Sequence, residues 1–346
     1  MIKFSSDHST LQISSVSQRI LTFLNPQLIT LVDMTDRSIE ALNALNRSPI
    51  DALECLKRFG ITSHRKRLST GPSMTIASDM LQAGFSPSSN EFLFSLLSSF
   101  RMKFLLDIRF RTRLPVQESV TCLGVIDELQ RLEKHQIFLK FVGADPSYPT
   151  ESRCLVKKRV LVGRNPSLHP GDLRICEAVE CSGLDHLENV VVFPSVGDRP
   201  LTNMMSGGDL DGDIYFVIWD PNLIPVAEDP PAEYSSAAPA PSSTWDLFGL
   251  AKRFAVSPGS DVFDIGNVVK FFVDYIRNDN LGIICNAHLA TADASSLKAR
   301  DYQCLQLAQL ASIAVDFFKT GIAAEIPSSL RPKKHPDLTV GNNILR

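Results

Sequence analysis

The stretch Ser206-Gly207-Gly208-Asp209-Leu210-Asp211-Gly212-Asp213 runs directly into the apolar segment Ile214–Trp219. Its three carboxylates stand at alternate positions, with glycines before and between them. Like charges this close repel one another, and a divalent cation removes the repulsion. Short aspartate side chains supply the hard oxygen ligands that suit Mg²⁺. Because the following segment is β-branched and aromatic, the stretch predicts a magnesium-binding loop at the start of a strand.

An EF-hand calcium loop is the first alternative, because it also begins with alternating aspartates. Such a loop needs glycine at its sixth position and glutamate at its twelfth, and it lies between two helices. Here those positions are Ile214 and Asp220, and a strand is expected in place of the second helix. The calcium interpretation is therefore excluded.

A second alternative is an acidic turn that binds no metal, since Asp and Gly are common turn residues. Two features favour a metal site. The glycines allow positive φ angles or a close approach to another segment. Strand-like segments on both sides, Val190–Phe193 and Ile214–Trp219, would hold the loop rigid, as a preorganised site requires. Mg²⁺ on such a loop indicates phosphoryl chemistry, with nucleotidyl transfer as the leading reaction class.

At these residues the chain resembles a known family, the cell-encoded RNA-dependent RNA polymerases of RNA silencing. The signature of that family is D-L-D-G-D, usually preceded by S-G-G, and Ser206–Asp213 reproduces both. Other blocks of the family recur in the same order along the chain. They are Met1–Phe4, Leu24–Leu31, Gly163–Asp172, Val191–Pro194, Gly197–Pro200, Asn278–Gly282, Asn286–Ala290, Ala314–Gly321 and Arg331–Lys334.

The resemblance implies an α+β fold: a double-psi β-barrel, the second of two in the catalytic core of the family, with flanking helical segments. It implies that Asp209, Asp211 and Asp213 bind Mg²⁺ and are catalytic. The implied reaction copies a single-stranded RNA template from ribonucleoside triphosphates and gives double-stranded RNA for RNA silencing. Other silencing proteins would be further partners.

Four residues in the matching blocks are candidates for contacts with nucleotide or RNA: Lys3, Arg164, Asn165 and His169. Arg164 can pair with a phosphate through two hydrogen bonds, or it can be a structural residue that holds the acidic loop. His169 can donate a proton to the leaving pyrophosphate, or it can make a structural hydrogen bond.

The composition limits other interpretations. The net charge of −3 does not indicate indiscriminate nucleic-acid binding, although basic residues can still cluster locally. Arg109 and Arg111 form the best such cluster, because on a strand they would present one face to RNA phosphates. The seven cysteines form no C-x-x-C pair, and the closest two, Cys176 and Cys181, lack zinc-ligand spacing and are expected to be buried. With no apolar run of about 20 residues and no secretory signal, an intracellular protein without a membrane partner is expected, in nucleus or cytoplasm.

Apolar periodicity and composition divide the chain into five segments, and the resemblance assigns them to parts of the family's catalytic core. Residues 1–32 are expected to be short strands left from the first barrel, and residues 33–104 a helical connector. Short strands between turns predict the catalytic barrel over residues 105–224. Residues 225–245 are expected to be a Pro/Ala/Ser-rich insertion, and residues 246–346 a helical segment leading to a missing head domain. The predicted strands are Ile108–Arg111, Val120–Val125, Ile137–Val142, Lys158–Val162, Glu177–Val179, Val190–Phe193 and Ile214–Trp219.

Two other functions remain open. One is a fragment of a DNA-dependent RNA polymerase large subunit, which shares the barrel and a similar acidic loop. The blocks Gly163–Asp172 and Asn286–Ala290 favour the silencing family over it. The other is a truncated, non-catalytic RNA-binding remnant, because members of the silencing family are several times longer than this chain. The intact acidic triad argues against a remnant.

Overall fold

The structure, a computed structural model, describes residues 31–58, 72–111, 116, 118–142, 152–156, 158–233, 280–315 and 323–333, with a few single positions between 265 and 276. The described residues up to Ala232 belong to one compact unit, and those from Glu233 onward belong to a second. The expectations for residues 1–30, which include Lys3 and most of the first-barrel remnant, lie outside the described residues.

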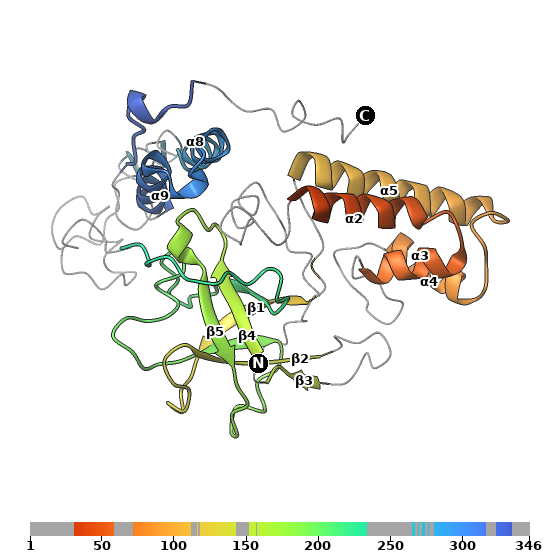
Figure 1. Cartoon of the computed structure of the whole chain (residues 1–346), viewed down its shortest axis with the longest axis horizontal. Helices are drawn as coiled ribbons and strands as arrows, with labels where there is room; N and C mark the ends of the chain where they lie inside the picture. The colour runs from red at the N-terminus through yellow and green to blue at the C-terminus, as the bar shows by residue number, and fades with distance from the viewer. Residues whose placement is uncertain are drawn as a thin grey trace. The chain divides into compact units, whose positions relative to one another are not determined.

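Four helices precede the barrel: α2 (Leu31–Ala44), α3 (Pro49–Arg58), α4 (Pro72–Gln82) and α5 (Glu91–Arg111). Each helix contacts the next, and α2 also contacts α5 (Figure 1). Their core consists of fully buried leucines at helical spacing: Leu42, Leu45, Leu56, Leu93 and Leu97. The helical pattern predicted for this region is confirmed. Leu31 and Val32, which were expected in a strand, instead begin α2.

The predicted strand Ile108–Arg111 is wrong, because these residues form the end of α5. The helix is 21 residues long, and once started a helix adds each further residue at little cost. Residues two apart on a helix lie about 200° apart around its axis. Arg109 and Arg111 therefore do not share the face on which their assignment to phosphate contacts depended.

Seven strands follow: β1 (Ser119–Ile126), β2 (Gln136–Val142), β3 (Ser152–Cys154), β4 (Lys158–Arg164), β5 (Arg174–Ala178), β6 (Val190–Phe193) and β7 (Ile214–Ile218). Six of them close into a barrel in the order β2-β5-β4-β7-β1-β6, with β6 pairing back to β2, and β3 pairs with β2 alone. Every strand predicted after residue 119 has a counterpart, although β5 begins at Arg174 where Glu177 was expected. The strand β3 was missed because three residues are too few to display an alternating pattern.

Alternate residues of each barrel strand form the core, as pleated strands require. They are Val120 and Cys122, Ile137, Leu139 and Phe141, Val160 and Val162, Cys176 and Ala178, Val191 and Phe193, and Tyr215 and Val217. Cys176 belongs to this core, and Cys181 is buried in a separate cluster with Phe138 and Val192. The expectation that both cysteines are buried is thus confirmed. Burial raises the pKa of the Cys122 thiol to about 12.

The strand β7 is buried on both faces, which explains its unbroken apolar sequence. Tyr215 and Val217 belong to the barrel core, whereas Phe216 and Ile218 are buried on the opposite face. Phe216 packs over Gly163 of the neighbouring strand, where an added Cβ would come within 2.4 Å of its ring. Because β7 is held from both sides, its start is a rigid point of attachment for the acidic loop.

The second unit contains the helices α8 (Leu281–Ala294) and α9 (Tyr302–Val315), which pack against each other. The Asn280 side-chain amide donates to the Ala324 carbonyl at 3.0 Å and ties the start of α8 to a later segment. Helices were predicted here, and they are present. Residues 234–264, which hold part of the predicted insertion, lie outside the described residues. Within the described part of the chain, no helix combines the length and the apolar character needed to cross a membrane.

Candidate metal centre

A tight turn leads into the acidic loop. Met205 in this turn is fully buried in the barrel core, and the Gly208 N–H donates to its carbonyl at 3.2 Å. Four residues of the turn and loop have positive φ angles: Ser206 (52°), Gly207 (67°), Leu210 (64°) and Gly212 (125°). Glycine adopts such angles without strain, whereas a serine or a leucine there needs compensating contacts.

Leu210 anchors the acidic loop to the barrel. Its side chain packs against the barrel core and lies 2.8 Å from the point that a Cβ on Gly124 would occupy. Asp209 and Asp211, on either side of it, are exposed. The apolar residue between the two aspartates therefore turns inward and leaves their carboxylates outside.

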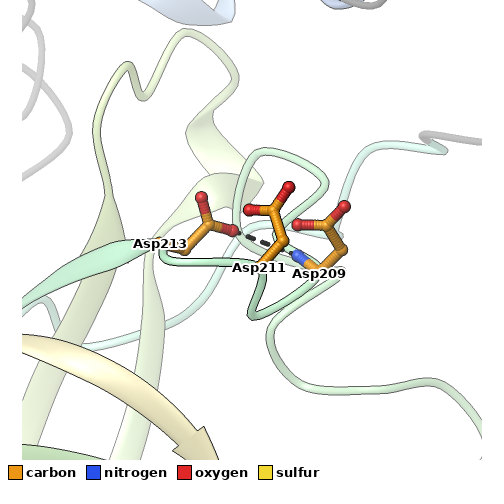
Figure 2. A group of neighbouring side chains, drawn as sticks. All are labelled: Asp209, Asp211 and Asp213. Carbon is orange, nitrogen blue, oxygen red and sulfur yellow. Dashed lines mark hydrogen bonds between the residues drawn. The ribbon is translucent and has the colours of Figure 1, made fainter. Parts of the chain in front are cut away.

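The three carboxylates lie together on one side of the loop (Figure 2). One oxygen from each of Asp209, Asp211 and Asp213 lies within 4.8 Å of the other two. Around an octahedral Mg²⁺ with metal–oxygen distances of about 2.1 Å, neighbouring ligand oxygens are ~3 Å apart and opposite ones ~4 Å. Small side-chain rotations close the difference, so the donor set fits a hard divalent cation.

Asp213 is fixed through both of its carboxylate oxygens, and it is only 8% exposed. Arg164 Nη2 lies 2.6 Å from Asp213 Oδ1. The Asp209 N–H donates to Asp213 Oδ2 at 3.1 Å, the dashed bond in Figure 2. The Tyr215 hydroxyl lies 3.5 Å from the same oxygen. Hydrogen bonds to an ionised carboxylate are stronger than neutral ones, and Asp213 Oδ1, paired with Arg164, has a second lone pair that a metal can use.

Tyr215 fits between two glycines. A Cβ on Gly124 would come within 2.5 Å of its ring, and a Cβ on Gly208 within 2.2 Å of its hydroxyl oxygen. The Phe193 ring packs edge-on against it, with the centroids 4.7 Å apart. Burial, and then the negative charge of Asp213, raises the pKa of Tyr215. The hydroxyl therefore stays protonated and can donate to the carboxylate.

Arg164 bridges two points of the acidic segment. Its Nη1 donates to the Ser206 carbonyl at 2.9 Å, and its Nη2 reaches Asp213. These two contacts correspond to the structural alternative for Arg164, in which the residue holds the acidic loop. Asn165, the next residue, is exposed.

His169 makes a structural hydrogen bond. Its Nδ1 accepts the Gly171 N–H at 3.0 Å and caps the short helix η1 (Pro170–Asp172). Burial lowers the pKa of His169, and the charge of Asp172 opposes that shift. With Nδ1 acting as an acceptor, the ring proton is on Nε2.

The family of the chain follows from comparison with known proteins. The family model for RNA dependent RNA polymerase matches residues 1–343. The chain belongs to the RNA-dependent RNA polymerase family. The resemblance seen in the acidic loop and the blocks around it is therefore confirmed.

Relatives in this family are similar over almost the whole chain. A probable RNA-dependent RNA polymerase 1 from Oryza sativa subsp. japonica is 37% identical, over 97% of this chain and 43% of its own length. RNA-dependent RNA polymerase 1 from Schizosaccharomyces pombe is also 37% identical, over 97% of this chain and 28% of its own length. The chain thus spans less than half the length of these relatives.

A solved structure shares the fold. The RNA dependent RNA polymerase QDE-1 from Thielavia terrestris aligns with a TM-score of 0.61 at 23% identity, over 93% of this chain and 35% of its own. Together with the closed six-stranded ring, this likeness confirms the predicted α+β fold with a double-psi β-barrel and flanking helical segments.

The structure brings together only some of the residues singled out from the sequence. The three aspartates and Arg164 meet, Asn165 and His169 lie in the adjoining block, and Lys3 is outside the described residues. Three residues that contact or anchor the loop were missed: Asp172, Leu210 and Tyr215. Only the position of Tyr215, two residues after Asp213 on an alternating strand, carried a signal that could have placed it beside the triad.

Proposed function

We propose that this chain carries the catalytic centre of RNA-templated RNA synthesis, in which ribonucleoside triphosphates are joined along a single-stranded RNA template. The observation that carries the proposal is the aspartate triad, held at the start of a doubly buried barrel strand in a member of the RNA-dependent RNA polymerase family. A nucleotidyl transfer centre needs clustered carboxylates on a rigid support, and this loop provides them.

The residues that would hold Mg²⁺ are Asp209, Asp211 and Asp213. When bound, the ion would lower the pKa of the attacking 3′-hydroxyl and offset the charge that develops on the leaving pyrophosphate. Asp213 supplies the fixed ligand, because Arg164 and the Asp209 N–H hold its two oxygens. Asp209 and Asp211 are exposed and can adjust to the substrate.

Neighbouring residues would bind and orient substrate. Asn165 is exposed beside Arg164 and offers an amide to a nucleotide or to RNA. Arg164 already contacts Ser206 and Asp213, which favours holding the loop over gripping a phosphate. His169 uses Nδ1 for its cap, so proton donation to pyrophosphate would come from Nε2.

The product of this reaction would be double-stranded RNA for RNA silencing, inside the cell and together with other silencing proteins. The names of the relatives support RNA-dependent synthesis. These relatives are more than twice as long as the region that matches this chain, so the proposal for this chain concerns the catalytic centre.

The test is nucleotide incorporation on single-stranded RNA and, separately, on single-stranded DNA, with Mg²⁺ present. Asp211→Ala removes one metal ligand and should lower incorporation by more than about 100-fold, since even residues that only support ligands cost 10–100-fold. Asp220→Ala is the matched control, because Asp220 lies outside the triad and bonds within its own turn. Equal activity in wild type and Asp211→Ala would overturn the proposal, and a preference for the DNA template would favour the DNA-dependent alternative. If only a longer chain is active, the same pair of variants in that chain decides the role of Asp211.

A further inference from the structure

Ser206 is held at three points by the block that precedes β5. Its N–H donates to Asp172 Oδ1 at 3.2 Å, and its Oγ donates to the Pro166 carbonyl at 2.7 Å. Its own carbonyl accepts from Arg164 Nη1 at 2.9 Å. A serine at a φ of 52° needs such contacts to stay there. The block therefore fixes the conformation of the residue from which the acidic loop departs.

The contacts of Arg164, Pro166 and Asp172 with Ser206 form a clamp on the start of the acidic loop, and Asp172 is at its centre. Its carboxylate is fully buried, and its Oδ2 accepts the N–H groups of Leu168 and His169, each at 2.9 Å. Its Oδ1 accepts the N–H of Ser206, which lies 34 positions further along the chain. A buried carboxylate is costly unless it is hydrogen-bonded. Asp172 thus couples the turn at residues 168–172 to the acidic loop.

The coupling leads directly to a metal ligand. Arg164 lies in the same block, and its guanidinium joins the Ser206 carbonyl to Asp213 Oδ1. If the N–H of Ser206 were released, two of its three contacts would remain, and the carbonyl that orients Arg164 would be less firmly fixed. The position of Asp213 relative to Asp209 would then be less well defined.

We infer that Asp172 is a positioning residue for the metal centre, acting through Ser206 and Arg164 on Asp213. The inference rests on the proposed function, because it assumes that the triad binds a cation. Asp172 itself does not touch the metal. Its effect is to keep the loop in the conformation that brings the three carboxylates together.

The decisive variant is Asp172→Asn. The single amide oxygen of asparagine can serve the two N–H groups of Leu168 and His169, and its NH₂ group would then face the N–H of Ser206. Two hydrogen-bond donors would then face each other, so the hydrogen bond to Ser206 is lost while those from Leu168 and His169 remain. Metal affinity should fall about 10-fold, the lower end of what supporting residues contribute.

The chain offers a closely matched control in Asp127. Its carboxylate is 1% exposed, and it also accepts three backbone N–H groups, those of Leu129, Arg131 and Leu132. These groups lie in the loop after β1, and none of them belongs to the acidic loop. Asp127→Asn should therefore lower stability to a similar extent and leave metal affinity unchanged.

The readout is Mn²⁺ binding to the full 346-residue chain by electron paramagnetic resonance, with Mg²⁺ as competitor, below the unfolding temperature of each variant. Weak binding in Asp172→Asn with normal binding in Asp127→Asn supports the inference. Equal affinities in wild type and Asp172→Asn, or equal losses in both variants, overturn it. If the wild type binds Mn²⁺ no better than Asp211→Ala does, the proposed metal centre is overturned as well. This comparison distinguishes failure of the metal centre from failure of the role inferred for Asp172.

A second variant covers the case in which Asp172→Asn does not fold. Ser206→Ala removes only the hydrogen bond from Oγ to the Pro166 carbonyl and keeps the N–H that donates to Asp172. It loosens the same clamp from the loop side, so metal affinity should again fall. An unchanged affinity in a folded Ser206→Ala protein would count against the clamp.

Discussion

Gly208 and Tyr215 show at the residue scale how closely the acidic loop fits the barrel. A Cβ at position 208 would lie 2.2 Å from the tyrosine hydroxyl oxygen and 3.0 Å from the Thr202 carbonyl. Gly208→Ala should therefore lower the free energy of unfolding by about 1–3 kcal/mol, as overpacking does. Tyr215→Phe removes the nearest atom of that clash, so the double variant should recover part of the loss.

A double-mutant cycle measures this coupling from urea unfolding of the wild type, the two single variants and the double variant. Trp219, stacked on Phe141 at 5.4 Å between ring centroids, places a fluorescent probe in the barrel. Additive losses would show that the alanine at position 208 and the hydroxyl do not meet.

His169 should make stability depend on pH. Burial lowers its pKa in the folded state, so the unfolded state binds more protons between the folded and unfolded pKa values. The contribution of this group to stability is thus complete above about pH 6.5 and is lost as pH falls below it. In His169→Asn, the amide oxygen can replace Nδ1 as the cap acceptor without titrating.

The measurement is the urea midpoint of the wild type and of His169→Asn between pH 5 and 8. The difference between the two proteins should change with pH, with the wild type losing relatively more stability on the acid side. Parallel curves for the two proteins would mean that His169 titrates alike in the folded and unfolded states.

At the scale of elements, the helices and strands that could be predicted from the sequence are those whose apolar residues form a recognisable run or repeat. The strands β1, β2, β4, β6 and β7 were predicted because each contains a short run of apolar, mostly β-branched or aromatic residues between turn residues. The end of α5 was misassigned because Arg109 and Arg111 alternate with other residues, although the helix before them was already established. Continuation of the established helix outweighed the local alternation of residues there.

The same limit applies to the candidate site. Asp209, Asp211 and Asp213 were predictable because their spacing alone brings them together. The bond between Asp172 and Ser206 was not, since it joins positions 34 apart through a turn whose geometry no short pattern specifies. Contacts that depend on how two elements meet require the structure.

The segment at residues 228–232, which follows β7, packs against Arg174 and Gly171, and this packing gives a further prediction. Arg174 is 4% exposed, contacts Glu228 through an ion pair of 3.2 Å and donates to the Asp229 carbonyl. The same segment covers Gly171 so closely that a Cβ there would lie 2.0 Å from the Pro230 carbonyl oxygen. Gly171→Ala should displace this segment and cost about 1–3 kcal/mol of unfolding free energy.

Gly282 on α8 is the matched control, because a Cβ there would meet nothing within 4 Å. Gly282→Ala should leave the urea midpoint unchanged or slightly higher, since alanine is the better helix former. A Gly171→Ala protein as stable as the wild type would show that the segment at residues 228–232 does not pack closely against η1.

At the scale of the whole molecule, the metal centre should be linked to the stability of the chain. The net charge is only −3, so a general effect of cations on the protein is expected to be small. A cation that binds the folded triad specifically adds stability that grows with its concentration, about 2.7 kcal/mol at 100 times its Kd. Mg²⁺ should therefore raise the unfolding temperature of the wild type.

Thermal unfolding in increasing MgCl₂, with ionic strength held constant by NaCl, measures this stabilisation. Asp211→Ala should show almost none, because only two carboxylates of the triad remain to hold the ion. Asp220→Ala should respond like the wild type, since Asp220 lies beyond the far end of β7. If Mg²⁺ stabilised all three proteins equally, the cation would be acting elsewhere than on the loop. A response confined to the two proteins with an intact triad would locate it there, whether or not this length of chain makes RNA.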